Sequence, residues 1–385
     1  METGRRRIAR NGNHPKTDPD NFCTGHWYQP ILWLTWFSKL AFYNPVQTTD
    51  TKEEDPPLVS IVICARNEEE NLEKNLRRFL NQTYRSIEIV LVDDQSTDKS
   101  LERMWSFQKT CSTFRIIIIR NANKNRAGKK EALAKGIGAA TGKIILLTDA
   151  DCIPANEEWV SQMVKLLNGE VDIVLGYSPY QKEKGFLNKF IRFETVYTAI
   201  QYLSFALAGK PYMGVGRNLM YRKKLFEKSD QFKTHLDIPS GDDDLFINSV
   251  SNSTNTVVSL SPQTFVLSEP SKSWEKYYTQ KARHLSTGSH YKWSDQIKLA
   301  LLSGTHLLHY MGGIVLLYIN SSTIFVFLLF VLRISVVWYI YRGVLNRLED
   351  KSLLKWIPLL DACLVLYYLI FIPSLLIKRK TKKWN

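Results

Sequence analysis

The chain has 385 residues and a net charge of +14, with 51 Lys and Arg against 37 Asp and Glu. Its mean hydropathy of −0.20 averages a polar part with two nearly unbroken apolar stretches, 297–341 and 357–377, so a simple soluble protein is excluded. Aromatic residues at 12% exclude general disorder, and five cysteines without a CxxC pair argue against a disulfide framework or a zinc site.

The first 57 residues contain three segments of different character. Residues 1–26 are polar and basic and lack the apolar core of a secretory signal, so we expect a loosely attached tail. Residues 27–43 are rich in aromatic side chains but shorter than the about 20 apolar residues of a spanning helix. They predict a helix in the lipid headgroup region, and the alternative is a helix packed on the globular domain. Residues 52–57 form a charged linker, so we treat 27–57 as one unit.

From residue 58 short β-rich runs alternate with helical patterns as far as residue 296, which predicts one globular domain. The predicted strands are 59–64, 87–92, 114–119, 143–147 and 171–175, and the predicted helices between them are 71–80, 99–108, 129–140 and 157–167. This order indicates an α/β fold with a doubly wound, mostly parallel sheet. Ligands of such sheets bind outside the carboxyl ends of the strands.

Acidic and amide residues follow three of the predicted strands. They are Ala65 to Glu68 after the first strand, Asp93 to Asp98 after the second, and Asp149 and Asp151 after the fourth. Neighbouring carboxylates repel unless a cation lies between them, and a D-x-D spacing suits Mg²⁺ or Mn²⁺ shared with a substrate diphosphate. The loop after the third strand adds the counter-charges Lys124, Arg126, Lys129 and Lys130.

Two common nucleotide-binding signatures are absent from the sequence. There is no GxxxxGK[ST] loop, and no GxGxxG follows the first strand, so a P-loop NTPase and a dehydrogenase are disfavoured. Gly214 and Gly216 predict a tight turn.

Five segments, in order and spacing, resemble the family 2 inverting glycosyltransferases of the GT-A fold, in their membrane-anchored bacterial form. The segments are VSIVICARNE (59–68), VDDQSTD (92–98), TDAD (148–151), GDDDL (241–245) and QKARH (280–284). The fourth segment is similar to the acidic base motif of the family. Together with Ser240 and Asn248, it resembles the form of this motif in hyaluronan synthases. The fifth resembles the Q/RxxRW motif of membrane-bound members. The resemblance implies a nucleotide-sugar donor, a divalent metal and inversion at the anomeric carbon.

The resemblance also implies a role for individual residues. The nucleotide base would be bound by Asp94 with Asp93 beside it, and Ala65, Asn67 and Glu68 would shape the same pocket. Lys129 would face the diphosphate, in a segment where Ala134 replaces the family's usual Asn. Asp151 would be the main metal ligand and Asp149 the second ligand and a donor contact. Gln280 and Arg283 would complete the donor site, with Arg283 facing the leaving diphosphate.

The general base is expected within the run Asp242 to Asp244. We expect Asp243 to act, with Asp242 as the alternative, because three successive aspartates leave the alignment open by one position. Mutual repulsion would raise the pKa of at least one of these carboxyl groups. The alternative is that these aspartates have no catalytic role and form a solvated acidic loop that caps a helix at 245–250.

The acceptor side is expected from the helical stretch 186–208 and from 211–221. Its expected contacts are Arg217, Asn218, Tyr221 and His284, with buried structural roles as the alternative for the first three. Because His284 stands where the family usually has Trp, the sequence favours a single transfer over processive synthesis.

The apolar stretches predict a membrane anchor. Residues 297–319 and 323–341 predict a hairpin of two spans, and the basic residues after it place its ends on the cytosolic side. The third segment, 356–377, contains Pro358, Asp361 and Pro373 and predicts a re-entrant or surface-lying hairpin; three spans are the alternative. Arg333 and Asp361 would pair with each other or meet a lipid phosphate, and His306 and His309 would bond between helices.

These patterns together predict an inverting glycosyltransferase in the inner membrane, with its catalytic domain in the cytoplasm. It would transfer one sugar from a UDP- or GDP-sugar to a lipid or lipid-linked acceptor, with Mg²⁺ or Mn²⁺. The alternatives are a processive polysaccharide synthase and a non-catalytic, sugar-nucleotide-binding scaffold. Nucleic acid is not an expected partner, because much of the positive charge flanks the apolar segments.

Overall fold

A computed structural model describes residues 29–44, 55–121, 128–233, 238, 240–318 and 323–376. The predictions made for the N-terminal tail, for Lys124 and Arg126 and for the basic residues after 377 lie outside the described residues.

The centre of the fold is a seven-stranded sheet with the order β3-β2-β1-β4-β7-β6-β8. The first four strands in this order are parallel and carry the long apolar runs, and they are β1 (Val59–Ala65), β2 (Ile87–Asp93), β3 (Arg115–Arg120) and β4 (Ile144–Asp149). The strand β7 (Leu219–Arg222) is antiparallel to both of its neighbours, β4 and β6 (Ile173–Leu175), and β8 (Thr256–Val258) closes the edge. The mostly parallel sheet is confirmed, and the sequence did not predict β7 and β8.

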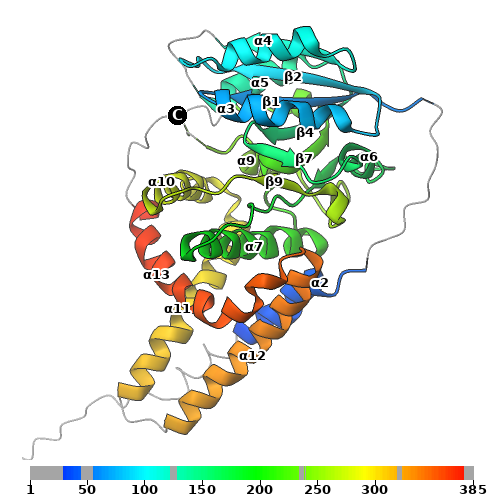
Figure 1. Ribbon diagram of the computed structural model, residues 1–385. Helices are drawn as coiled ribbons and strands as arrows, with labels where there is room; N and C mark the ends of the chain where they lie inside the picture. The colour runs from blue at the N-terminus through cyan, green and yellow to red at the C-terminus, as the bar shows by residue number, and fades with distance from the viewer. Residues whose placement is uncertain are drawn as a thin grey trace, which may run out of the picture.

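Helices cover both faces of the sheet, as expected for a doubly wound fold (Figure 1). On one face lie α3 (Glu69–Asn75), η2 (Leu76–Asn81), α4 (Ser100–Thr110) and α6 (Trp159–Val164), and on the other lies α5 (Lys129–Ala139). All seven residues of β1 and of β2 are buried, because both faces of these strands are covered. A small second sheet pairs β5 (Cys152–Pro154) with β9 (Val266–Ser268).

A second layer lies between the sheet and the apolar helices (Figure 1). It contains α7 (Phe186–Leu207) and α10 (Trp274–Leu285), and α8 (Lys223–Lys228) and α9 (Asp244–Val250) lie nearer the sheet. The short 3₁₀ turns η3 (Gly216–Asn218), η5 (Pro262–Thr264) and η6 (Gly288–His290) connect these elements, and η3 is the tight turn that the two glycines predicted.

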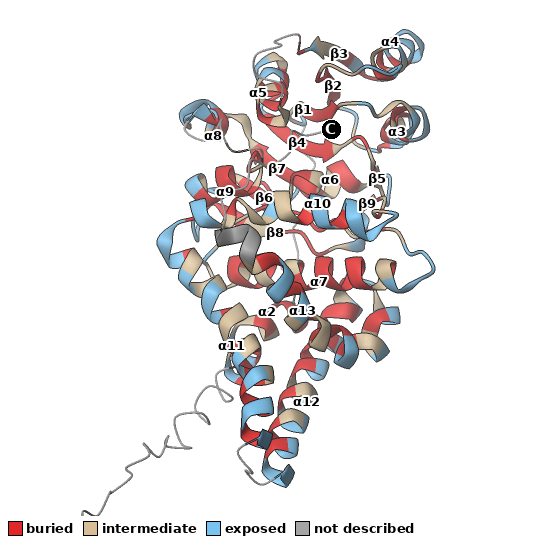
Figure 2. Cartoon of the chain, turned by 90° about the vertical axis from the view of Figure 1, so that its left-hand side faces the viewer, coloured by how far each residue is buried: buried red, intermediate tan, exposed pale blue. Residues whose placement is uncertain are grey.

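Within the part of the chain that the structure describes, three helices are long and apolar enough to cross a membrane, namely α11 (Trp293–Tyr318), α12 (Thr323–Arg347) and the segment Lys351–Ile372. The helices α11 and α12 project together away from the sheet, and their far halves are largely exposed (Figure 2). The third segment begins with η7 (Lys351–Trp356) and continues as α13 (Ile357–Leu376). The prediction that it is itself a hairpin is wrong, because α13 is one helix. Pro358 lies in the first turn of α13, where a backbone N–H would have no partner within the helix, so no helical hydrogen bond is lost. Pro373 lies in the last turn.

The N-terminal aromatic segment packs on the protein, which was the alternative prediction. It is helical from residue 29 and continues through η1 (Trp33–Phe37) and α2 (Ser38–Ala41). The Trp33 ring lies 5.1 Å from that of Tyr341 in α12, and Phe37 lies 6.2 Å from Phe205 in α7. Its opposite face remains exposed and apolar.

The charged residues inside the apolar helices pair with each other. Arg333 of α12 donates from Nη2 to Asp361 Oδ1 of α13 at 3.1 Å and from Nε to Gln29 Oε1 at 3.0 Å. Tyr310 of α11 donates to Asp361 Oδ2 at 2.7 Å, and His306 Nδ1 accepts from Arg333 at 3.0 Å. The network joins all three helices, so the predicted pairing of the two charges is confirmed.

The close approach of α5 to the sheet gives a test of the fold. A Cβ at Gly136 would lie 2.7 Å from Val92 Cγ2 and 2.9 Å from Val62 Cγ1, whereas one at Gly138, on the same helix, would meet nothing within 4 Å. We expect Gly136→Ala to lower the free energy of unfolding by about 1–3 kcal/mol through overpacking. Gly138→Ala is the matched control and should raise it by up to about 1 kcal/mol. Denaturant unfolding measures both, and equal effects of the two changes would contradict the packing described here.

Candidate active site

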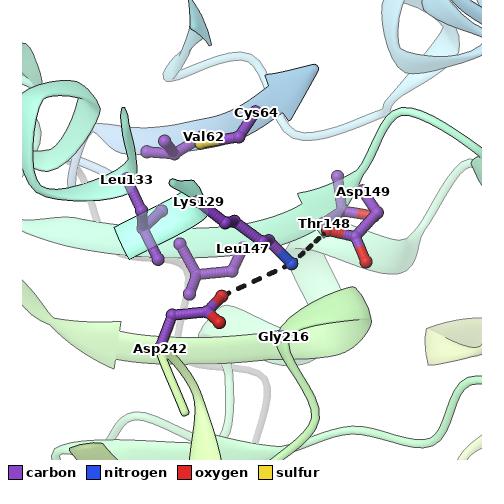
Figure 3. Close-up of a pocket in the computed structure, with 9 residues that line it drawn as sticks. All are labelled: Val62, Cys64, Lys129, Leu133, Leu147, Thr148, Asp149, Gly216 and Asp242. Carbon is purple, nitrogen blue, oxygen red and sulfur yellow. Dashed lines mark hydrogen bonds and ion pairs between the residues drawn. The ribbon is translucent and has the colours of Figure 1, made fainter. Parts of the chain in front are cut away.

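Lys129 forms ion pairs with two carboxylates, one at the carboxyl end of β4 and one in the acidic run before α9. Lys129, the first residue of α5, donates to Asp149 Oδ1 at 2.8 Å and lies 3.4 Å from Asp242 Oδ2. Figure 3 shows its ammonium group between the two carboxylates. Although burial opposes it, Asp149, Asp242 and Asp243 raise the pKa of Lys129 well above its usual value. The lysine is therefore a permanent cation at the centre of the site.

Asp149 and Asp151 offer the oxygen ligands of a divalent metal. Single atoms of Asp149, Asp151 and Cys152 lie within 4.8 Å of one another. Burial and then the charge of Asp149 raise the pKa of Asp151, as expected where two carboxylates converge. Burial also raises the pKa of the Cys152 thiol far above its usual value, and this thiol donates to Asp151 Oδ1 at 3.2 Å. The donor set is thus two hard carboxylates, which fits Mg²⁺ or Mn²⁺.

The three aspartates before α9 have three different environments. Asp242 is buried beside Lys129. Asp244 is buried and accepts hydrogen bonds from the hydroxyls of Thr287 and Tyr291, the latter at 2.6 Å. Asp243 accepts from the backbone N–H groups of Gly216 at 2.6 Å and Asp244 at 2.8 Å. All three aspartates line the cavity described below. The alternative of a solvated acidic loop is wrong.

Asp243 has the proton affinity that a general base near neutral pH needs. Burial, then the charges of Asp242 and Asp244, raise its pKa to about 7. The charge of Lys129 and the hydrogen bond from the N–H of Gly216 lower the pKa of Asp243, but by less.

The residues after β1 and β2 interlock at the same edge of the sheet. The N–H of Asp94 donates to Ala65 O at 2.9 Å, and Asn67 Oδ1 accepts from the N–H of Thr97 at 2.8 Å. Asp93 Oδ1 accepts from the N–H of Ser96 at 3.3 Å. Asp94 Oδ2 is buried without a hydrogen-bond partner among the described residues, and Arg66 Nη1 lies 3.9 Å from it as an ion pair.

One cavity of about 830 Å³ connects Lys129, the Asp149 and Asp151 pair and the acidic run before α9 with the apolar helices, and Ala65, Asn67, Asp93 and Asp94 do not line it. Its lining at the sheet edge includes Glu68, Lys129, Asp149, Asp151, Asp242 and Asp243. Burial raises the pKa of Glu68 to about 7. Beyond the second layer the lining becomes apolar, with Leu299, Leu302 and Leu307 from α11 and Phe371 and Ile372 from α13. The cavity therefore has a charged end and an apolar end.

Helix α10 supplies the middle of the cavity. Gln280 donates to the Tyr180 hydroxyl at 3.3 Å, and Arg283 makes no ion pair with any described residue. His284 lines the cavity. Burial, and then the charges of Lys281 and Arg283, lower the pKa of its imidazole well below the usual value. The imidazole is therefore neutral at neutral pH.

Two of the predicted acceptor contacts are wrong. Asn218 is fully buried, where it accepts from Trp159 Nε1 at 3.0 Å and donates to Thr264 O at 2.7 Å. Tyr221 is fully buried in β7 against Phe246. Tyr221 is internal because β7 is a central strand of the sheet. Asn218 ends η3, just before this strand, and is held inside by its bonds to Trp159 and Thr264. Arg217 does line the cavity, with its guanidinium 4.4 Å from the centre of the Tyr180 ring.

The sequence interpretation missed two charged residues of the cavity wall, Glu194 and Lys281. A signal for Glu194 was present, since it is the one acidic residue in the largely apolar stretch 186–208.

Comparison with known proteins identifies the domain. Residues 60–230 match Glycosyl transferase family 2. These residues, which are less than half of the chain, are similar to family 2 glycosyltransferase domains. An uncharacterized glycosyltransferase of Haemophilus influenzae is 34% identical over 114 residues, which are 30% of this chain and 34% of the relative. The Escherichia coli protein named UDP-Glc:alpha-D-GlcNAc-diphosphoundecaprenol beta-1,3-glucosyltransferase WfaP is 33% identical over 135 residues, 34% of this chain and 49% of its own length.

The alignments thus span between a third and a half of these relatives. The mannosyltransferase PcManGT from Pyrobaculum calidifontis, solved in complex with GDP-Man and Mn²⁺, has a TM-score of 0.58 at 18% identity, over 90% of this chain and 97% of that one. This likeness confirms the GT-A type of fold. The family 2 match ends before Asp242 and α10, so the base motif and the QKARH segment lie outside it.

Proposed function

We propose that the protein is a metal-dependent, inverting glycosyltransferase that moves a single sugar from a nucleotide sugar to a lipid or lipid-linked acceptor. The observation that carries this proposal is the cavity that joins the carboxylates of the family 2 domain to the apolar walls of α11 and α13. A charged donor fits one end, and a lipid chain fits the other. WfaP, by its name, uses UDP-Glc and a lipid-linked acceptor, and PcManGT binds GDP-Man with Mn²⁺. These two proteins support the proposed donor and the proposed acceptor.

The donor would bind along the rim of the sheet. Asp94, with Asp93, Ala65, Asn67 and Glu68, would form the nucleotide pocket. Asp151 and Asp149 would hold Mg²⁺ or Mn²⁺, which neutralises charge on the diphosphate. Lys129 and Arg283 are the nearby cations for the same diphosphate, and Gln280 supports the α10 side.

Transfer is a single displacement in which Asp243 acts as the base. Asp243 accepts the proton of the acceptor hydroxyl while the oxygen bonds to the anomeric carbon and the bond to the diphosphate breaks, which inverts that carbon. Asp243 is preferred to Asp242 because Asp242 forms an ion pair with Lys129, whereas Asp243 accepts from two backbone N–H groups and has a raised pKa of about 7. Arg217 and His284 are the acceptor contacts that remain in this proposal.

The membrane arrangement follows from where the third apolar segment begins and ends. Arg192 of α7 donates from Nε to Asp350, just before η7, at 3.0 Å. Asp361 then meets Arg333 in the middle of α12, and Phe371 stacks on Tyr278 of α10 at 5.1 Å. Both ends of the segment thus contact the second layer of the fold, so we infer that α11 and α12 cross the inner membrane and that η7 and α13 enter and leave from the cytoplasmic side.

The proposal keeps the predicted division of the chain. Residues 58–296 are the catalytic domain, 297–341 the membrane hairpin and 342–385 the re-entrant element with its basic flanks, after the tail 1–26 and the helix and linker 27–57.

A donor screen tests the activity. Purified protein with Mn²⁺, membrane lipid and a panel of UDP- and GDP-sugars should yield a lipid that is heavier by one hexose in mass spectrometry, and EDTA should abolish it. A ladder of products would favour the processive alternative, and the absence of both transfer and donor hydrolysis would favour the scaffold.

The pH dependence tests Asp243. Its pKa of about 7 means that the ionised, proton-accepting form grows as pH rises, so transfer at saturating donor should increase about tenfold from about pH 6 to about pH 8. Asp243→Asn should lower transfer by about a hundredfold or more and leave donor affinity unchanged. Normal turnover in this variant would refute the assignment.

Reporter fusions test the membrane arrangement. Alkaline phosphatase should be active in a bacterial host when it is fused after Tyr318 and inactive when it is fused after Leu376. Activity at both positions would show that the third segment crosses the membrane.

A further inference from the structure

The wall of the cavity contains a buried ion pair that has no part in the donor site. Lys281 Nζ of α10 lies 2.5 Å from Glu194 Oε2 of α7, and the two side chains are 11% and 5% exposed. The Thr198 hydroxyl donates to the other carboxylate oxygen, Glu194 Oε1, at 3.0 Å. All three residues line the cavity.

The pair lies between the two ends of the cavity. Three residues beyond Glu194 on α7, the Tyr197 hydroxyl is 2.8 Å from that of Tyr368 in α13, at the apolar end. Two residues beyond Lys281 on α10, Arg283 lines the same cavity as Asp149 and Asp151. A lipid whose chain lies against α13 and whose head reaches Asp243 must pass this pair.

Stability alone does not account for such a pair. Burial removes both charges from water, and apolar side chains of similar volume often pack at least as well in such positions. A ligand that uses both groups accounts for it, because a carboxylate accepts from a hydroxyl while an ammonium donates to one. Tyr180 and Gln201 add further polar groups and an aromatic face to the same wall.

The charges at this level indicate the class of head group. The pair sums to zero, and Glu194 would repel a phosphate. Of the other cations of the cavity, Lys129 pairs with Asp149 and Asp242, and Arg217 lies over the Tyr180 ring, with its guanidinium 4.4 Å from the ring centre. Arg283 is the cation that the proposed mechanism assigns to the donor diphosphate.

We propose that Glu194 and Lys281 bind the head of the acceptor, and that this head is an uncharged, hydroxyl-bearing group on a lipid rather than a lipid phosphate. The inference rests on the proposed function and adds to it the class of acceptor. One hydroxyl of the head bonds to the anomeric carbon and gives its proton to Asp243, while the diphosphate leaves with the electrons of the broken bond.

Two acceptors with the same chain test the inference on the unaltered, full-length protein in phosphatidylcholine nanodiscs. Decyl β-D-glucoside presents hydroxyls, and decyl phosphate presents a phosphate. With the donor selected by the screen, we expect kcat/KM for decyl glucoside to exceed that for decyl phosphate by roughly tenfold or more. A preference for decyl phosphate would overturn the inference.

A double variant tests the residues. Glu194→Gln with Lys281→Met keeps the side-chain volumes and removes both charges, and it should raise KM for decyl glucoside roughly tenfold. Hydrolysis of the donor without acceptor and the melting temperature should not change. The exposed pair of Glu183 and Lys272 is the matched control, and Glu183→Gln with Lys272→Met should leave KM unaltered.

The possible outcomes separate the two proposals. An unchanged KM in a folded Glu194→Gln, Lys281→Met variant overturns the role of the pair. If the unaltered protein hydrolyses no nucleotide sugar at all, the proposed function itself fails and the inference fails with it. Donor hydrolysis together with transfer to decyl phosphate alone refutes only the inference.

Discussion

The ion pairs of Lys129 are the interaction on which the rest of the site depends. Asp149 ends a parallel strand, whereas Asp242 precedes a helix more than ninety residues later in the chain, and both carboxylates converge on one ammonium group. Without that cation the buried carboxylates would repel one another across a region of low dielectric constant. Lys129 therefore lets the parallel part of the sheet and the base motif approach each other, and the position of Asp243 follows from that approach.

The sequence predicts the part of the fold that long apolar runs specify. The strands β1 to β4 each have six or seven residues, and the groups that follow them lie at one edge because parallel strands end together. The strands β6, β8, β5 and β9 have three residues and β7 has four, too few for a periodic signal. That gap explains the error at Tyr221, because the central position of β7 depends on pairing that local sequence does not encode, and Asn218 ends the turn η3 just before this strand.

The three adjacent aspartates show a second limit of the sequence, since identical side chains differ only in their partners. Asp242 faces Lys129, Asp243 faces the cavity, and Asp244 bonds to Thr287 and Tyr291. Four residues after Asp244, Asn248 donates to Asp295 at 2.9 Å and accepts from the N–H of Lys292 at 2.9 Å. Helix α9 is thus fixed to the segment that opens α11, which makes the orientation of the proposed base depend on the start of a membrane helix.

The candidate membrane helices α11 and α13 consequently line the same cavity as the site residues. Residues of α12 and α13 belong to the same buried cluster as α5 and α7, and the Arg333–Asp361 pair holds α13 to α12 while Phe371 lies against α10. Because α13 returns to the second layer, it forms a wall of the cavity that also contains Glu194 and Lys281. An acceptor drawn from the bilayer would therefore meet apolar side chains first, the neutral ion pair next and the carboxylates last. In this order Glu194 and Lys281 would contact the head group before it reaches Asp243. The position of α13 would therefore help to determine which acceptor the protein uses.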